Sequence, residues 1–469
     1  MHVRRQPGGL DLRTRNDRVR HENQRPAERT VPVNRLSKFF RLEERGTDFR
    51  TEIMAGIITF MTMAYILAVN PSVLAATGMS FEKVFSATAI VSAVSTLVMG
   101  IAANLPFALS AGMGLNAFFA YTVCQGLGYS WRWALTAILC EGIIFLILTF
   151  FNIREAIVNC IPGCLKKAIG AGIGFYIAFI GLQNAGIVIG GSTLVELNEA
   201  WFKGSAGVAM LGLIVTSILL VKKVKSAILI GMIFTAVIGI PFGVTRYAGG
   251  RFLPSAPYFF PFAFDEIFRS GKSMFDFFIV LFTFLFVDMF DTVGTLIGCA
   301  GKSGILREDG SIPNCKEALL ADAIGTTGGA ILGTSTVTTF VESASGVAAG
   351  GRTGLTAVTA AVLFLLSLFL EPLFASIPSA ATAPALVIVG VMMASPIKEI
   401  DFSDFREAIP AFLCVLFMVC AYSISDGIMF GLLSYVIINA LTGRSERVEK
   451  MAWVLVALFV LRIVTKALV

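Results

Sequence analysis

Charged residues are scarce in this chain of 469 residues, because Asp, Glu, Lys and Arg together make up only 14% of it. A soluble domain carries about 25% charged residues. Histidine occurs only as His2 and His21, so none of the long apolar segments contains one. Among the eight cysteines, Cys160 and Cys164 form the one close pair, with no histidine nearby. These absences argue against a soluble enzyme and against a metal or cofactor site built from histidine and cysteine.

Apolar residues are abundant instead, at 56% of the chain, and the mean hydropathy is +0.80. A membrane span needs roughly 20 mostly apolar residues. Such segments fall at 52–70, 83–103, 107–124, 132–151, 166–183, 205–221, 226–244, 274–300, 317–333, 335–350, 353–370, 379–395, 408–424 and 426–442. The sequence therefore predicts an all-α polytopic membrane protein with fourteen transmembrane segments.

The segments divide the chain into five regions. Residues 1–50 are polar and Arg-rich, and we expect a disordered cytoplasmic tail in which Leu36–Leu42 forms a short surface helix. Residues 51–244 and 274–443 each hold seven segments, and 245–273 is a loop between them. Residues 444–469 end in an apolar stretch that carries Arg462 and Lys466, so it is either an interfacial segment or an extra span.

The distribution of Lys and Arg predicts the orientation. Thirteen of the 37 lie before Thr51, so the net charge of +6 indicates a basic tail and not a nucleic-acid partner. With this tail in the cytoplasm and fourteen alternating spans, the inside loops hold fifteen basic residues and the outside loops seven. Basic residues favour the cytoplasmic side. We therefore expect a multi-pass protein of the cell membrane with a cytoplasmic N-terminus.

Seven plus seven spans predict two inverted repeats, since an odd number of spans reverses the second half. The third and tenth segments both have a composition that is unusual for a continuous helix. The third opens with Pro106 and is then rich in glycine, whereas the tenth begins with the Thr-rich run 334–339. We expect each to contain a short extended piece followed by a half-helix, which must line a cavity inside the protein. The alternative is two ordinary helices with small faces for close packing.

Five carboxylates lie well inside the predicted spans: Glu141, Asp288, Asp291, Asp322 and Glu342. An ionised carboxylate in hydrocarbon is costly, so each needs a partner or water, and such residues mark functional sites. Asp288 and Asp291 are three residues apart and share a helix face, and one of two repelling carboxylates tends to keep a proton. Without histidine, proton coupling has to use these groups. Glu141 and Asp322 are equally well explained as helix–helix contacts.

Two further residues lie beside the predicted breaks. Phe340 precedes Glu342 by two positions in chain that we expect to be extended, so both side chains would point the same way. An aromatic ring beside a carboxylate suits a flat heterocycle with N–H donors, although a packing role explains Phe340 equally well. Asn116 lies just inside the half-helix of the third segment, where a polar side chain has either a structural or a binding role.

Four blocks of sequence resemble one known family. They are Thr51–Ile66 with the following Asn70-Pro71, Ser110–Ala117, Asp288–Thr295 and Thr338–Gly346. In this order they resemble the AzgA-like adenine/guanine/hypoxanthine permeases, a branch of the nucleobase/ascorbate transporter superfamily. The resemblance covers about Thr51 to Gly443 and leaves the tail outside.

The resemblance implies two inverted repeats arranged as a core domain of spans 1–4 and 8–11 and a gate domain of spans 5–7 and 12–14. It implies proton symport of purine bases, with the substrate carboxylates of the superfamily at Asp288 and Glu342 and its aromatic at Phe340. Because position 288 is Asp where other branches have Glu, it stays open whether Asp288 touches the base or only its proton. The expected substrate site consists of Glu342, Asp288, Phe340, Asn116, Ser110, Gly112 and Ser343.

The working hypothesis is a proton-coupled importer of adenine, guanine or hypoxanthine that uses alternating access, with no cofactor and no metal. Glu342 would accept two N–H donors, and Asp288 with Asp291 would hold the proton. The alternatives are a uracil/xanthine-type symporter, an anion exchanger of the sulfate or bicarbonate type, a membrane enzyme and a receptor. A carboxylate at Glu342 argues against the anion exchanger because it would repel the substrate. Whether the chain forms a homodimer stays open.

Overall fold

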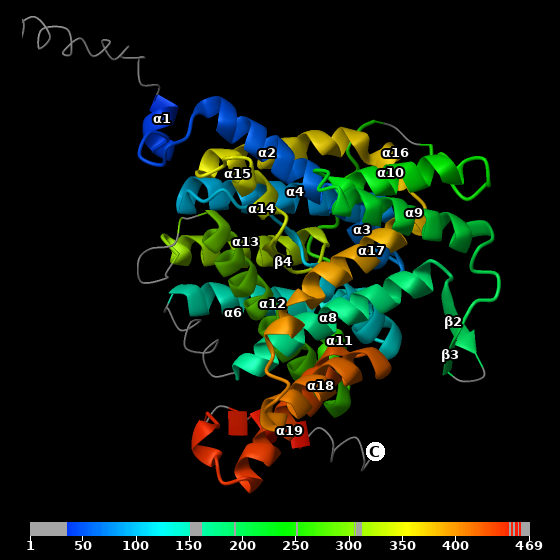
Figure 1. Ribbon diagram of the computed structural model, residues 1–469, viewed down its shortest axis with the longest axis vertical. Helices are drawn as coiled ribbons and strands as arrows, with labels where there is room; N and C mark the ends of the chain where they lie inside the picture. The colour runs from blue at the N-terminus through cyan, green and yellow to red at the C-terminus, as the bar shows by residue number, and fades with distance from the viewer. Residues whose placement is uncertain are drawn as a thin grey trace, which may run out of the picture.

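The structure is a computed structural model. It describes residues 35–150, 162–191, 194–249, 252–303, 305, 312–449, 452–453, 455–457 and 459–460. Almost all of this chain is helical, and the helices form one bundle (Figure 1).

The first half of the chain supplies α1 Arg35–Phe40, α2 Phe49–Met63, α3 Ile66–Ala75, α4 Phe81–Val98, the π-helical turn η1 Met99–Ala103, β1 Leu109–Ala111, α5 Met113–Ala117, the π-helical segment η2 Phe118–Gly126, α6 Trp131–Phe150, α8 Gly163–Asn184, β2 Val188–Gly191, β3 Leu194–Leu197, α9 Gly204–Val221 and α10 Ala227–Gly239. β2 and β3 form an antiparallel hairpin at the edge of the bundle (Figure 1).

The second half supplies α11 Phe264–Ile267, α12 Gly271–Ser303, α13 Cys315–Leu332, β4 Val337–Thr339, α14 Ser343–Ala348, α15 Gly354–Ser367, η3 Leu368–Leu370, α16 Glu371–Ala375, α17 Ser379–Ala394, η4 Ser395–Glu399, α18 Phe405–Cys420, α19 Ile424–Leu441 and η5 Ser445–Arg447. Each of the fourteen predicted apolar segments coincides with one or more of these elements, in the predicted order.

Eight helical stretches in the described residues are long and apolar enough to cross a membrane. They are Phe49–Ala75, Phe81–Ala103, Trp131–Phe150, Gly163–Asn184, Gly204–Val221, Gly354–Ala375, Ser379–Glu399 and Ile424–Leu441. The prediction of a helical polytopic membrane fold is therefore confirmed, while the count of fourteen crossings stays a prediction.

The third and tenth segments contain the strands β1 and β4, as their composition predicts. The two strands pair antiparallel, with Leu109 opposite Thr339 and Ala111 opposite Val337, so they join the two halves of the chain. Each strand is followed by a short helix, α5 after β1 and α14 after β4. Every residue of the pair is buried, which agrees with the rule that irregular chain at membrane depth has to be enclosed by protein.

The Thr-rich run before and within β4 is held by side chains from several helices. Asn70 Nδ2 of α3 donates to Thr334 Oγ1 at 2.9 Å. Thr336 Oγ1 donates to Glu141 Oε2 of α6 at 3.0 Å. The amide of Val337 donates to Thr326 Oγ1 of α13 at 3.2 Å. Helix α13 ends at Leu332. Because the next residue, Gly333, has a φ of +85° that is costly for other residues, the chain turns sharply into this run.

The helices form two sets. The strand-pair set comprises α2, α3, α4, α5, η2, α6, α12, α13, α14 and α15 around β1 and β4, and it combines elements of both chain halves. The α8 set comprises α8, α9, α10, α17, α18 and α19. In Figure 1 blue α2 lies beside yellow α15, and orange α17 crosses green α8. The α8–α17 contact depends on glycine, because a Cβ on Gly174 would lie 2.5 Å from the carbonyl oxygen of Gly390.

Part of the predicted tail is ordered. Helix α1 coincides with the expected surface helix, and Phe40 and Leu42 are buried against Leu355 of α15. Asn104 Nδ2 donates to the carbonyl oxygen of Phe40 at 3.1 Å. The expectation of disorder is therefore wrong for residues 35–50, because apolar side chains and buried hydrogen bonds attach them to the bundle. Residues 1–34 lie outside the described residues.

The C-terminal segment also contacts the bundle. Ala452, Leu455 and Phe459 are buried, and the Phe459 ring meets that of Phe282 on α12 with 6.3 Å between centroids. Residues 461–469 lie outside the described residues, so the placement of 444–469 at the interface or across the membrane stays a prediction.

Candidate functional site

Glu342 lies in the turn that connects β4 to α14. Its backbone is helical, with φ −60° and ψ −21°, and its side chain is only 7% exposed. The Thr-rich strand brings the chain to the middle of the strand-pair set, and the turn then places the carboxylate beside α2, α3 and α12. A carboxylate in such a place has to be satisfied by polar neighbours.

The expectation that Phe340 and Glu342 point the same way is wrong. It required extended chain through both residues, but β4 ends at Thr339. The amide of Ser343 donates to the carbonyl oxygen of Phe340 at 3.1 Å, and that of Ser345 donates to the carbonyl oxygen of Glu342 at 2.9 Å. These bonds close a turn, so the two-residue alternation of a strand does not apply. They also engage the first amides of α14 within the protein.

Tyr65 is the direct partner of the Glu342 side chain. It lies between α2 and α3, where the first apolar segment is interrupted at Ala64 and Tyr65, and its side chain is buried. The Tyr65 hydroxyl donates to Glu342 Oε1 at 2.8 Å. A hydrogen bond to a charged acceptor is stronger than one between neutral groups, so this contact orients the carboxylate.

Asp288 and Asp291 of α12 belong to a larger acidic group. Thr292 Oγ1 donates to Asp322 Oδ1 of α13 at 2.7 Å and lies 3.4 Å from Asp288 Oδ1. Asp291 lies near Thr338 of β4 and near the carboxylates of Asp322 and Glu342. Asp291 therefore lies near Asp322 and Glu342, and Thr292 links Asp322 to Asp288. The roles of these carboxylates in binding stay a prediction.

Asn116 lies on α5, across the strand pair from Glu342. Its Oδ1 accepts a short hydrogen bond from Ser335 Oγ. The side chain is fully buried, and its Nδ2 has no hydrogen-bond partner among the described residues. A buried amide donor without a partner is costly, so this group is available for an acceptor on a ligand. The amide of Gly112, just before α5, donates to the carbonyl oxygen of Thr336 at 2.9 Å.

The hydroxyls of Ser110 and Ser343 are used within the protein. Ser110 Oγ and Ser92 Oγ of α4 form a hydrogen bond of 2.7 Å. Ser343 Oγ accepts a hydrogen bond from the amide of Ala108 at 3.0 Å. Both residues therefore hold β1 in place.

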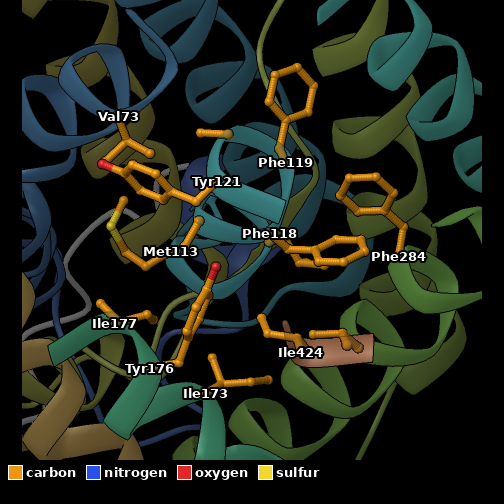
Figure 2. Close-up of a cluster of buried hydrophobic side chains, with 14 of the residues drawn as sticks. Val73, Met113, Phe118, Phe119, Tyr121, Ile173, Tyr176, Ile177, Phe284 and Ile424 are labelled. Carbon is orange, nitrogen blue, oxygen red and sulfur yellow. The ribbon is translucent and has the colours of Figure 1, made fainter. Parts of the chain in front are cut away.

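Apolar side chains surround the half-helix α5. Met113 and Phe118 lie opposite Ile173 and Ile177 of α8, and the hydroxyl of Tyr176 points between them (Figure 2). Phe340 is 6% exposed and belongs to the same buried cluster. Its position beside the turn of Glu342 is compatible with either stacking on a ligand or packing, the two roles the sequence left open.

Polar bonds connect the strand-pair set to the α8 set on one side of this cluster. Asn184 Nδ2 of α8 donates to the Tyr121 hydroxyl of η2 at 3.0 Å. The hydroxyls of Thr122 and Tyr176 lie 3.2 Å apart, and Thr122 Oγ1 also donates to the carbonyl oxygen of Tyr422 at 3.3 Å. Any movement of one set against the other would break these bonds.

Within the described residues, no group of three or more His, Cys, Asp and Glu side chains has the arrangement of a metal site. Hydroxyl groups donate to several of the acidic side chains, among them Glu342, Glu141 and Asp322.

Solved structures with this fold are membrane transporters. The transmembrane domain of the cyanobacterial bicarbonate transporter BicA matches with a TM-score of 0.62 at 13% identity, covering 81% of this chain and 97% of that one. Murine Slc26a9, an anion transporter in the inward-facing state, matches with a TM-score of 0.57 at 10% identity, covering 94% and 77%. At such identities the likeness shows the fold alone. The fold is therefore that of a helical polytopic membrane protein.

Relatives in sequence identify the family of membrane proteins to which the chain belongs. A putative permease of Methanocaldococcus jannaschii is 47% identical over 430 residues, covering 92% of this chain and 98% of the relative. The guanine/hypoxanthine permease PbuG of Bacillus subtilis is 42% identical, covering 91% and 99%, and the adenine permease AdeQ of Escherichia coli is 39% identical, covering 92% and 96%. The model of the Permease family, Xan_ur_permease, matches residues 50–430. The chain belongs to this permease family, and its resemblance to the purine-base branch of the nucleobase/ascorbate transporter superfamily is confirmed.

Sequence reasoning missed Tyr65 and Glu52. Tyr65 was part of the quoted block Thr51–Ile66, but a tyrosine in an apolar segment gives no signal of its partner. Glu52 is fully buried, although it is near the start of a span, where the sequence predicts solvent access. The one sequence feature that could have indicated the buried position of Glu52 was that a carboxylate lies just inside an apolar segment.

Proposed function

We propose that this protein is a proton-coupled purine nucleobase permease that imports adenine, guanine or hypoxanthine by alternating access. The observation that carries the proposal is the buried carboxylate of Glu342, oriented by Tyr65 beside the paired strands of two interrupted segments. Relatives that are about 40% identical over nearly their whole length are adenine and guanine/hypoxanthine permeases, which supports the substrate class.

The proposed architecture has fourteen membrane crossings in two inverted repeats. The protein lies in the plasma or inner membrane, and its N-terminus is in the cytoplasm. The strand-pair set would be the core domain and the α8 set the gate domain. The matching order of apolar segments and elements, the excess of basic residues in the inside loops and the transporter fold of the solved structures support this arrangement.

In the proposed site Glu342 accepts N–H donors from the purine edge, because its Oε2 is not engaged by Tyr65. Asn116 Nδ2 donates to a purine oxygen or ring nitrogen. Phe340 stacks on the ring, and the backbone around Gly112 and Ser343 lines the site with Ser110. Each of these roles is a proposal that rests on the burial and the contacts described above.

The coupled proton is proposed to bind Asp288, with Asp291 as its neighbour on the same helix face. Thr292 donates to Asp288, and Asp291 lies near further carboxylates, so binding a proton would relieve the repulsion within this acidic group. Movement of the core against the gate would then break the contacts of Tyr121 and Thr122 with the α8 set and expose the site on the other side.

The alternative of a uracil/xanthine-type symporter uses the same chemistry and differs only in the ring that is accepted. An anion exchanger is favoured by the solved structures, since BicA transports bicarbonate, but that likeness concerns fold alone. The acidic group of Asp288, Asp291 and Glu342 would repel an anion. Whether two copies associate is a separate proposal that these contacts do not address.

Glu342→Gln tests the site. An amide accepts with one atom only and presents a donor with the other, so one N–H of the purine would face a donor. Leaving a buried polar group unpaired costs about 1–3 kcal/mol, which corresponds to several-fold to about a hundredfold weaker binding. We expect this loss for hypoxanthine in equilibrium binding to purified protein.

The matched control is Glu371→Gln, since Glu371 is equally buried at 6% exposure but contacts Ser255 in the loop before α11. We expect that variant to bind like the parent. Unchanged binding in Glu342→Gln would show that Glu342 is not the purine contact, and Asp288 would be the next candidate.

A further inference from the structure

The first apolar segment contributes a side chain to the proposed site. Helix α2 ends at Met63 and α3 begins at Ile66, and Tyr65 lies in the short turn between them. From this turn the ring enters the core, where its side chain is 1% exposed, and its hydroxyl reaches Glu342 on a segment 277 residues away in the sequence. A buried phenol needs a partner, and here that partner is the carboxylate that the proposed function assigns to the purine.

The position of Tyr65 is fixed by the segments on both sides of it. The amides of Ala68 and Val69 donate to its carbonyl oxygen, each at 3.0 Å. One turn further along α3, Asn70 Nδ2 bonds to Thr88 of α4 at 2.7 Å and to Thr334 before β4 at 2.9 Å. Tyr65 and Glu342 are therefore carried by elements that are bonded to each other, so the hydroxyl and the carboxylate are held in register.

We propose that Tyr65 is the positioning residue for Glu342 in substrate recognition. The proposal rests on the proposed function. By donating to Oε1, the hydroxyl fixes the plane of the carboxylate and directs Oε2 toward an N–H donor of a flat heterocycle. A carboxylate without this bond is free to rotate about its side-chain torsions, and a ligand then has to order it at the expense of affinity.

A second tyrosine–carboxylate hydrogen bond lies elsewhere in the chain and can serve as a control for the Tyr65–Glu342 bond. The Tyr129 hydroxyl donates to Asp276 Oδ2 at 2.8 Å, the same distance as in the Tyr65–Glu342 bond. Asp276 lies near the start of α12, before the acidic group of the site. Tyr129→Phe therefore removes an equivalent tyrosine–carboxylate bond without touching the proposed site, and it controls for the loss of such a bond as a purely structural effect.

The test is a double-mutant cycle with radiolabelled hypoxanthine in equilibrium binding to the purified full-length chain. Tyr65→Phe keeps the ring and removes the hydroxyl, and we expect binding about tenfold weaker, as for loss of a hydrogen bond to a charged group. In the Glu342→Gln background the same change should alter affinity less than about twofold, because the partner it acts on is gone. Tyr129→Phe should bind like the parent.

Four results would contradict the inference. Unchanged binding in Tyr65→Phe would mean that Glu342 needs no positioning, and tighter binding would mean that the base replaces the hydroxyl on the carboxylate. An equal loss in both backgrounds would assign Tyr65 a structural role only. A parent protein that bound no purine would overturn the proposed function and this inference with it, whereas the first three outcomes leave the proposed function standing. Size-exclusion profiles of all variants establish that each is folded.

Discussion

Three buried carboxylates in the strand-pair set accept a hydrogen bond from a neutral hydroxyl. Tyr65 donates to Glu342, Thr336 to Glu141 and Thr292 to Asp322, at 2.8, 3.0 and 2.7 Å. A hydroxyl stabilises a carboxylate without neutralising it, so the group keeps its demand for a proton or an N–H donor. A carboxylate held by neutral donors suits protons and neutral bases, as the proposed function requires, whereas a site for anions would need basic side chains or free amides.

Asp288→Asn tests which residue holds the proton. The amide cannot bind the coupled proton, so we expect folded protein that no longer accumulates hypoxanthine against its gradient. The measurement is the accumulation ratio in proteoliposomes under an imposed pH gradient. Asp276→Asn, a change at a 7% exposed position on the same helix, is the control and should accumulate normally. Accumulation that still followed the pH gradient in Asp288→Asn would move the proton to another group, with Asp291 the next candidate.

At the scale of elements, the two interrupted segments could be predicted because β-branched threonine and repeated glycine disfavour a continuous helix. The pairing of β1 with β4 could not, since its register depends on tertiary contacts such as Thr326 with Val337. For the same reason the direction of Glu342 was predicted wrongly. The pattern of a strand does not reveal that the chain turns at Phe340, and the role of Tyr65 depends on that turn.

Glu52 connects α2 to the start of α15 and so fixes the loop that follows the half-helix α14. Its carboxylate accepts from the amide of Arg352 at 2.8 Å and from the amide and hydroxyl of Thr356 at 3.2 and 2.6 Å. It thereby caps α15 from another segment.

Glu52→Ala leaves these donors buried without an acceptor, and we expect a loss of about 3 kcal/mol in stability. The apparent melting temperature of the purified protein in detergent should fall by several degrees, and Glu52→Gln, which keeps one acceptor, should lose less. The exposed Glu82→Ala is the control and should melt like the parent. A Glu52→Ala protein as stable as the parent would show that water or other groups replace the carboxylate.

At the scale of the molecule, the sequence predicted the helical membrane class and the order of the apolar segments. Hydropathy was sufficient for this because the bilayer imposes the length of a span directly. The hydropathy pattern does not reveal which helices pack against each other. The interleaving of α2 with α15 and of α6 with α13 depends on packing between distant segments, and so does the attachment of residues 35–50 to Leu355.

Uptake by the purified protein in proteoliposomes tests the central claim, that this permease carries purine bases driven by protons. With the lumen more alkaline than the medium, we predict that radiolabelled hypoxanthine accumulates above its external concentration and that dissipating the pH gradient releases it. Unlabelled adenine or guanine should compete, whereas sulfate and bicarbonate should not. Vesicles that exchanged sulfate or bicarbonate and took up no purine would contradict the account and establish an anion exchanger on the same fold.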